Sequence, residues 1–384
     1  MTALAEQTGA WLEQFTAQPP VEPWIQRLRE AAFERFAELG FPTTHDEEWR
    51  FTNVAPIARG GWKTVGQASG LPSVDPAVEP HLVQHASFEG NAFVALNTAF
   101  IEDVKVITVP RNTVLEAPIE VHYAAGQAGN LPHYHPRTLI LVGAGSQCTI
   151  VERYSGDGRY FTNAVTEIVA GDGAVVDHYK VQQESIEAYH VATLQASLGR
   201  SANFSSHSIS LGATLARNDV GVVLSEGSEA VINGLYIVNG TQHVDNHTVI
   251  DHAKPHGTSH ELYKGILDGQ AHAVFNGRIV VRPDAQKTDS KQTNKNLVLS
   301  DDAVVDTKPE LQIHADDVRC THGATIGQLD SEMMFYLQSR GIGRGQARSL
   351  LTYAFAQDIV DRIKVKDLRD SLERILFEKF HEHA

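Results

Sequence analysis

The sequence predicts a mainly β protein in which a β-solenoid lies between helical regions at both ends. The first observation is that four successive glycines, Gly143, Gly171, Gly199 and Gly227, are separated by one fixed interval. The second is that the runs after each glycine alternate apolar and polar residues, a period typical of strands. The third is helical periodicity near both ends of the chain. A fixed interval of this length indicates stacked repeats, because one repeat buries its apolar face only against its neighbours.

The N-terminal region, residues 1–60, is predicted to be helical. Its apolar residues recur at steps of three and four along one stripe: Trp24, Ile25, Leu28, Ala32, Phe36 and Leu39. This stripe ends at Gly40, a residue suited to a helix C-terminus. The acidic and aromatic segment PTTHDEEWRFTN, residues 42–53, follows. Residues 61–103 include a stretch rich in Gly, Pro and Ser and are predicted to form a connector.

The central region, residues 104–326, is predicted to form the solenoid. Strand-like runs separated by turns continue to about Arg319, but the fixed interval holds only for the four glycines named above. The next candidate repeat starts lie near Gly269 and Asp301, in each case after a longer interval. Either insertions or a change of turn geometry would explain these longer intervals, and the sequence leaves both open.

The C-terminal region, residues 327–384, is predicted to contain three helices. In DSEMMFYLQSRG, Asp330 or Ser331 is suited to accept hydrogen bonds from the first free amides of a helix. Two further segments, 346–363 and 368–380, each place apolar residues on one face. We expect the terminal helices to cap the exposed rungs of the solenoid, whose edges would otherwise offer unpaired backbone groups.

The composition disfavours several classes of partner and location. The chain of 384 residues has 32 basic and 47 acidic side chains, a formal net charge of −15, which disfavours nucleic acid and anionic membranes as partners. Two cysteines, Cys148 and Cys320, exclude a disulfide framework and indicate a reducing compartment. The N-terminus lacks the features of a secretory signal, and no apolar run approaches the ~18 residues of a membrane span. We therefore expect a soluble, cytoplasmic protein.

Cys320 and His322 form the sharpest pair of chemistry-bearing residues. They lie in VRCTHGAT, where the strand pattern gives way to helices. In an extended backbone, residues two apart point to the same side with Cα atoms roughly 6–7 Å apart. A thiolate beside an imidazole can hold a soft or borderline metal or support sulfur chemistry. The alternative is a small buried cysteine beside a hydrogen-bonded histidine, and the spacing alone favours that alternative.

The densest group of potential metal ligands lies in residues 243–260. It comprises His243, His247, His252, His256 and His260. Imidazole is a common ligand for zinc, iron and copper, so a stand-alone His-rich metal-binding protein is one hypothesis. On a strand, however, residues four apart are separated by roughly 13 Å. Histidines spread along the solenoid are therefore favoured over a single site.

A second alternative is a carbohydrate-active β-helix enzyme. Acidic side chains that could serve it are Asp284, Asp289, Asp301 and Asp302, but the sequence does not establish their separation. Motifs of several other enzymes are missing: the chain has no G-x-x-x-x-G-K-[ST] phosphate loop, no CxxC pair and no G-x-S-x-G elbow. Any nucleotide hydrolysis must therefore come from a partner.

Long segments of the chain resemble the SufB/SufD family, the scaffold components of the Suf iron–sulfur cluster assembly machinery. The resemblance rests on residues 261–342, on PTTHDEEWRFTN, on HPRTLILVGAGS and on the helical tail. Within the family the pattern is of the SufD type. The functional cysteine of the SufB type would fall near Asn294, and the glutamate of its H-E-A-T motif on Gly323. The important histidine of the SufD type falls on His322, two residues after Cys320.

The resemblance implies a right-handed parallel β-helix between the two helical regions. It implies a non-catalytic scaffold that pairs with SufB through the β-helix and binds the ATPase SufC through the C-terminal helices. Iron or a nascent iron–sulfur cluster would be held transiently at the interface with SufB, which supplies the persulfide chemistry. His322, with Cys320, is implied to face that iron. Reduced flavin is implied for the complex, without a site that can be placed in this chain.

Overall fold

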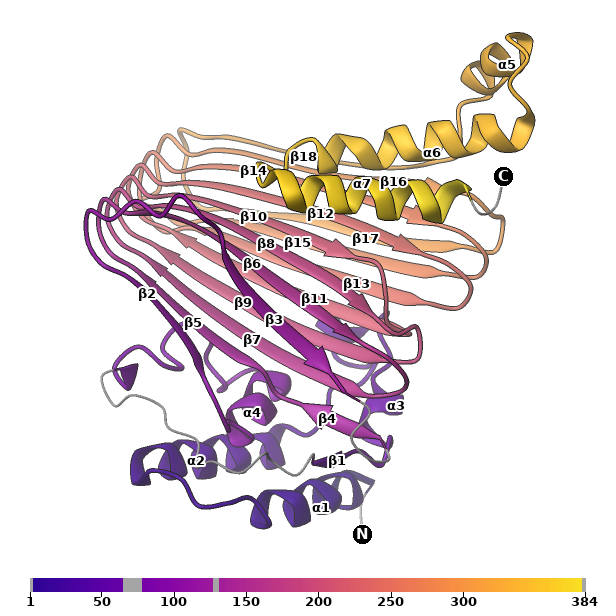
Figure 1. The fold of residues 1–384 in the computed structure, drawn as a ribbon. Coiled ribbons are helices and arrows are strands. Elements are labelled where there is room, and N and C mark those ends of the chain that lie inside the picture. Colours follow the sequence, from indigo (N-terminus) through magenta and orange to yellow (C-terminus); the bar gives the residue numbers. More distant parts are fainter. Residues whose placement is uncertain (1–2, 65–77, 127–130, 382–384) are drawn as a thin grey trace.

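Two parallel β-sheets form the body of the molecule, and from residue 137 onward the chain passes from one sheet to the other at every turn (Figure 1). The structure is a computed structural model that describes residues 3–64, 78–126 and 131–381. From residue 137 onward, strands two apart in sequence pair with each other, and every pair is parallel. Helices lie at both ends of the chain. The prediction of a mainly β solenoid with flanking helices is confirmed.

The first sheet, called sheet A here, contains ten strands and the second, sheet B, contains eight. The strands of sheet A are β1 (Lys63–Thr64), β2 (Lys105–Val109), β4 (Pro132–Tyr134), β5 (Arg137–Val142), β7 (Phe161–Ala170), β9 (Tyr189–Leu198), β11 (Leu215–Leu224), β13 (His243–His252), β15 (His272–Val281) and β17 (Val304–Ile313). The strands of sheet B are β3 (Ile119–Ala125), β6 (Gln147–Gly156), β8 (Val175–Glu184), β10 (Asn203–Ser210), β12 (Glu229–Val238), β14 (Thr258–Leu267), β16 (Asp289–Val298) and β18 (Arg319–Gly327).

The repeat continues to the end of the solenoid, but its length changes. Phe204 of β10 pairs with Val176 of β8 at the same interval as the four glycines, and with Ala230 of β12 at an interval two residues shorter. From the pair β12–β14 onward, register partners are always farther apart than the glycines, and they are farthest apart in β15–β17. Because the strands keep about the same length, the additional residues lie mainly in the turns. Insertions therefore explain the longer intervals that the sequence shows after Gly227.

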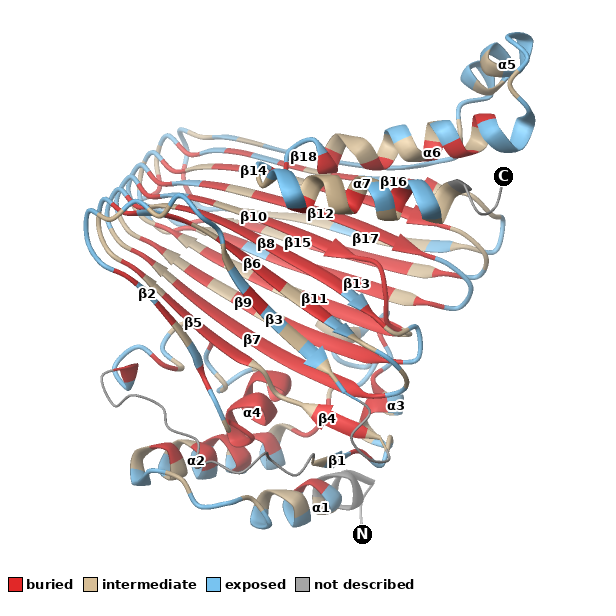
Figure 2. Ribbon diagram, viewed as in Figure 1, coloured by how far each residue is buried: buried red, intermediate tan, exposed pale blue. Residues whose placement is uncertain are grey.

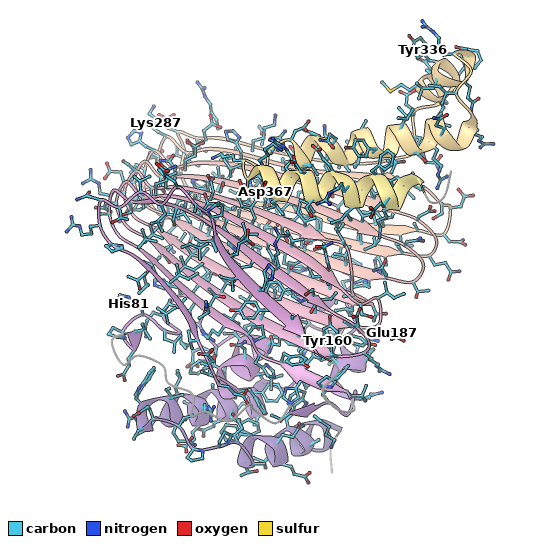
Figure 3. All side chains as sticks on the ribbon, in the orientation of Figure 1. His81, Tyr160, Glu187, Lys287, Tyr336 and Asp367 are labelled. Atoms are coloured by element: carbon cyan, nitrogen blue, oxygen red, sulfur yellow. The ribbon has the colours of Figure 1, made fainter. Side chains whose placement is uncertain are left out.

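The glycines at the predicted repeat starts do not all occupy one place. Gly143, Gly171 and Gly199 each directly follow a strand of sheet A, whereas Gly227 lies two residues later in its turn, with a φ of 64° that favours glycine. The predicted later start near Gly269 is wrong: it lies at the opposite end of the rung, between β14 and β15. The start near Asp301, between β16 and β17, is wrong for the same reason. In Figure 3, Lys287 marks the end of the rungs where Gly143, Gly171 and Gly199 lie, and Glu187 marks the opposite end.

The N-terminal helices cover the outer face of sheet A. They are α1 (Ala3–Thr16), α2 (Pro23–Leu39), the 3₁₀ turn η1 (Glu47–Trp49), α3 (Ala55–Ala58) and α4 (Ala92–Ala99). Trp11, Phe36 and Phe93 of the helices pack with Phe161 and Tyr189 of the sheet in one buried cluster. Helix α4 is buried along its whole length, within the range predicted to be a connector. Residues 65–77 of that range lie outside the described residues.

The C-terminal helices do not cap the last rung, contrary to the expectation from sequence. They are α5 (Ser331–Ser339), α6 (Arg344–Val360) and α7 (Lys366–His381). Ile359 of α6 and Leu372 of α7 are buried against the outer face of sheet B, with Leu235 and Ile266. Their apolar stripes cover the apolar outer side of the sheet rather than its edge. Helix α5 projects from the body and has no buried residue (Figures 1 and 2).

We predict that Gly171→Ala destabilises the solenoid while Gly327→Ala does not. A Cβ on Gly171 would lie 2.7 Å from the backbone nitrogen of Ala144 in the preceding rung, whereas a Cβ on Gly327 meets nothing within 4 Å. Overpacking of this kind costs about 1–3 kcal/mol. Urea unfolding of both variants measures the difference, and equal stabilities would contradict the close stacking of the rungs at Gly171.

Candidate functional site

The solenoid is open at its C-terminal end. Strands β17 and β18 are the last of their sheets, and no other described strand pairs with their outer edges. Residues of β18 are almost all exposed, whereas its neighbour β16 buries alternate residues. A free strand edge presents unpaired N–H and C=O groups and readily pairs with another chain. This end of the molecule is therefore suited to binding a partner.

Cys320 and His322 lie on β18, in register with Ser290 and Gln292 of β16. Ser290 and Gln292 are buried inside the solenoid. Because register partners on parallel strands share a face of the sheet, Cys320 and His322 continue this inward-facing row to the open end. The structure thus places the predicted pair on one side of one strand. Cys320 is partly buried and His322 is exposed.

The thiol of Cys320 is protonated near neutral pH in this environment. It packs against the small apolar cluster that includes Ile279, Val281 and Ala285. Burial raises the pKa of the thiol, and the nearby Asp289 carboxylate raises it further. A protonated thiol is a poor nucleophile, but a bound metal ion can displace its proton. Cys320 is therefore better suited to be a metal ligand than a sulfur nucleophile.

The interior of sheet B is partly apolar and partly polar: β8 buries the inward-facing His178, Lys180 and Gln182, and β16, next to the open end, is polar along most of its inward side. Ile150 of β6 and Phe204 of β10 belong to the apolar core, whereas β16 buries Ser290, Gln292, Asn294 and Asn296. These polar residues form hydrogen bonds inside the solenoid, such as the one of 2.6 Å from Nδ2 of Asn296 to Oδ1 of Asn294. The sequence did not predict these buried residues, because the polar run DSKQTNKNLV resembles an exposed strand until the register shows which residues face inward.

Two family comparisons cover most of the chain. Residues 123–355 match the family described as "SUF system FeS cluster assembly, SufBD core domain". Residues 71–121 match the "SufBD protein N-terminal region". The chain belongs to the SufBD family. The resemblance stated from the sequence motifs is thereby confirmed, and the protein is an iron–sulfur cluster assembly protein of this family.

Curated relatives of this SufBD-family protein are similar along most of their length. A SufBD family protein of Synechocystis is 31% identical, over 97% of this chain and 95% of its own length. The iron–sulfur cluster assembly protein SufD of Escherichia coli is 34% identical, over 74% of this chain and 69% of its own length. SufD of Bacillus subtilis is 26% identical, over 74% of this chain and 66% of its own length.

The histidines between residues 243 and 260 of this SufBD-family protein do not converge. His243 and His247 lie on the outer face of β13, His252 faces inward from the same strand, His256 lies in the next turn and His260 lies on the outer face of β14. No three His, Cys, Asp or Glu side chains in the described part of the chain are grouped so that they could hold a metal ion. This geometry gives no support to a stand-alone metal site at these histidines.

The carboxylates considered for a carbohydrate-active enzyme are also separated. Asp284 and Asp289 lie at one end of β16, and Asp301 and Asp302 lie just beyond its other end. A strand of ten residues spans roughly 30 Å, whereas the two carboxyl groups of a glycosidase lie about 5–10 Å apart. The two groups therefore cannot form such a pair across the strand.

The segment of residues 42–53, which supported the family resemblance, binds the outer face of sheet A. Its Glu48 forms an ion pair of 2.7 Å with Arg278 of β15. The guanidinium of Arg217 of β11 lies 3.6 Å from the ring centroid of Trp49. These contacts join the N-terminal region to the middle and later rungs of the solenoid. We call this segment the clasp.

Asp245 is the buried centre of the contacts between the clasp and β13. It accepts hydrogen bonds of 2.5 Å from Thr52 and 2.6 Å from Arg217, and pairs with His247 at 3.0 Å. Burial opposes a charge on His247, but the Asp245 carboxylate outweighs this effect and raises the histidine pKa to about 9. A protonated imidazole does not bind metal. His247 is therefore an ion-pair partner of the clasp.

No helix in the described ranges is both long enough and apolar enough to cross a membrane. This finding agrees with the absence of a long apolar run in the sequence. The helices instead use their apolar faces to pack on the two sheets.

We predict that His247 makes stability fall as pH rises from about 6.5 to about 9. Its pKa is 6.5 in the unfolded chain and about 9 in the folded protein, so the folded state retains a proton that the unfolded state releases. Protonated His247 therefore stabilises the folded protein by roughly 3 kcal/mol. This stabilisation is fully present below about pH 6.5 and is lost as the pH rises through about 9. In urea unfolding, the stability difference between wild type and His247→Gln should shrink over this range. A constant difference would contradict the ion pair, and exposed His260→Gln serves as the control.

Proposed function

We propose that this chain is the SufD-type scaffold subunit of a cytoplasmic iron–sulfur cluster assembly complex. It pairs with a SufB-type subunit through the open end of its solenoid and binds a SufC-type ATPase through its C-terminal helices. Iron or a nascent cluster is held transiently where the two solenoids meet. The observation that supports this proposal best is the open last rung, which leaves Cys320 and His322 uncovered beside free strand edges.

The last rung has the properties of a surface that another chain covers. Its strands expose three large apolar side chains: Val304 and Ile313 of β17, and Ile326 of β18. Together with the unpaired backbone groups, these side chains favour the addition of strands from a partner. A partner solenoid with its own open end could meet both requirements at once.

A partner would complete the protein ligands for iron in this arrangement. Cys320 and His322 supply one sulfur and one nitrogen, both suited to iron, and the described residues offer no group of three such donors. A shared site of this kind suits transient cargo, because its ligands are complete only in the complex. The reactive sulfur would come from the partner, since the thiol of Cys320 has a raised pKa.

Helix α5 is suited to bind the ATPase. It exposes Met333, Phe335 and Tyr336, with 72% of Phe335 accessible. Figure 3 shows Tyr336 at the tip of the molecule, away from both sheets. Exposed aromatic and methionine side chains grouped on one projecting helix are typical of a protein interface. The chain itself has no phosphate-binding loop, so ATP hydrolysis is assigned to the partner.

We predict that His322→Ala lowers cluster formation without dissociating the complex. Losing even the hydrogen-bond partner of a metal ligand weakens metal binding about 10–100-fold, so loss of the ligand should have at least this effect. The chain is co-expressed with SufB-type and SufC-type partners, purified without oxygen, and tested for iron content and cluster absorbance. The control is His260→Ala, an exposed histidine on the opposite face of sheet B. A normal cluster yield in His322→Ala would contradict the role of this residue.

We predict that Phe335→Asp abolishes binding of the SufC-type ATPase and leaves pairing with the SufB-type subunit intact. A buried aromatic anchor contributes about 2 kcal/mol or more to an interface, and a carboxylate in its place adds a desolvation cost. Co-purification of the two partners measures the effect. Leu12→Asp, an exposed apolar residue of α1, is the control. Undiminished ATPase binding by the Phe335 variant would place the docking surface elsewhere.

A further inference from the structure

A buried glutamine separates His322 from a buried carboxylate. Glu261, Gln292 and His322 occupy the same register position on β14, β16 and β18. Glu261 is 3% exposed and Gln292 is 1% exposed, whereas His322 is exposed at the open end. Register partners on neighbouring parallel strands share a face and lie roughly 4.8 Å apart. The three residues therefore form one inward-facing row that reaches the surface at His322.

The amide of Gln292 has one hydrogen-bonded end and one end without a partner. Its Nε2 donates a hydrogen bond of 2.7 Å to Oε2 of Glu261. Its Oε1 is buried and accepts no hydrogen bond from the described residues. Gly277 of β15 makes room for the amide, because a Cβ at this position would lie 2.2 Å from Nε2 of Gln292. The facing sheet and Glu261 together hold the amide in one place.

The unpartnered Oε1 of Gln292 has a suitable donor in the next rung. A buried acceptor without a hydrogen bond is unfavourable. His322 is the next residue in the row, and a neutral imidazole has one N–H donor and one nitrogen lone pair. At a strand spacing of roughly 4.8 Å, rotation of the exposed His322 side chain brings a ring N–H within hydrogen-bond reach of Oε1.

We propose that Gln292 is a positioning residue for His322: its Oε1 accepts the imidazole N–H and directs the other ring nitrogen out of the open rung, toward iron. This hydrogen bond fixes one tautomer of the ring. Glu261 acts one step further back, because its carboxylate holds Nε2 and so turns Oε1 toward β18. Histidines that bind metals usually donate their second N–H to such an acceptor. The inference rests on the proposed function of His322, but the hydrogen bond can be tested without iron.

The direct test is the tautomer of His322 in the full chain. Long-range ¹H–¹⁵N spectra of histidine-labelled protein distinguish the two neutral tautomers, and His322→Ala assigns the signal. Burial raises the pKa of Glu261 to about 7, so spectra are recorded at about pH 8, where its carboxylate is mostly ionised. We expect one dominant tautomer in the wild type. Gln292→Leu, which has similar volume but no acceptor, should show a mixture.

Two further variants separate positioning from simple structural damage. The exchange Glu261→Gln with Gln292→Glu again places an acceptor oxygen opposite His322, now from a carboxylate with an amide behind it, and should restore the single tautomer. Ser290→Ala changes the neighbouring inward-facing row, in register with Cys320, and should leave the tautomer of His322 unchanged. The affinity of the complex with the SufB-type subunit for Co²⁺, used as a spectroscopic probe, should fall about 10–100-fold in Gln292→Leu and recover in the exchange variant.

The outcomes distinguish this inference from the proposed function. If His322→Ala lowers cluster yield but the tautomer and the Co²⁺ affinity are unchanged in Gln292→Leu, the positioning role is wrong and the proposed function stands. If His322→Ala leaves cluster yield unchanged, the proposed function fails, and the tautomer still decides whether the hydrogen bond exists. Should Gln292→Leu fail to fold, the exchange variant decides: a mixture of tautomers in that folded protein would overturn the proposal.

Discussion

The hydrogen bonding between parallel rungs is the constraint on which the rest of the structure depends. From β5 onward, strands two apart in sequence pair with each other, so the interior rungs are complete and the unpaired backbone groups lie at the ends. The N-terminal helices and short strands cover the early rungs, while α6 and α7 cover the outer face of sheet B. The edges of β17 and β18 stay available, and the proposed partner site follows from this incomplete rung.

The sequence predicts the kind of fold well, because stacking needs repeated turns and alternating strands that leave a visible pattern. It predicts poorly where in the rung the later repeats begin. The interval from Gly199 to Gly227 equals the two before it, although β9 and β11 are displaced by two residues fewer, because the second glycine occupies a different position in its turn. Longer repeats then hide the turn positions. Physical spacing is set by strand pairing, and turns absorb additional residues at little cost.

The candidate site was predicted in part. The strand pattern places Cys320 and His322 on one side of an extended segment, and the structure agrees with this. Their position at the uncovered end of rows of buried polar residues could not be predicted from the sequence, because it depends on the register of β14, β16 and β18. The contacts of the clasp could not be predicted from the sequence either, because Glu48 and Asp245 are far apart in sequence but share His247 as an ion-pair partner. Polar side chains inside a solenoid are costly unless they are hydrogen-bonded, and here hydrogen-bonded polar groups lie both in the middle rungs, as with Glu152 and His178, and next to the open end.

The proposed role of His322 is to bind iron at the open end of the solenoid. Pulsed EPR of the reduced, iron-loaded complex tests this most directly when only the histidines of this chain are labelled with ¹⁵N. We expect a ¹⁵N coupling from a histidine bound to the iron centre, lost in His322→Ala and retained in His260→Ala. A wild-type complex without such a coupling, or a coupling that persists in His322→Ala, would contradict it.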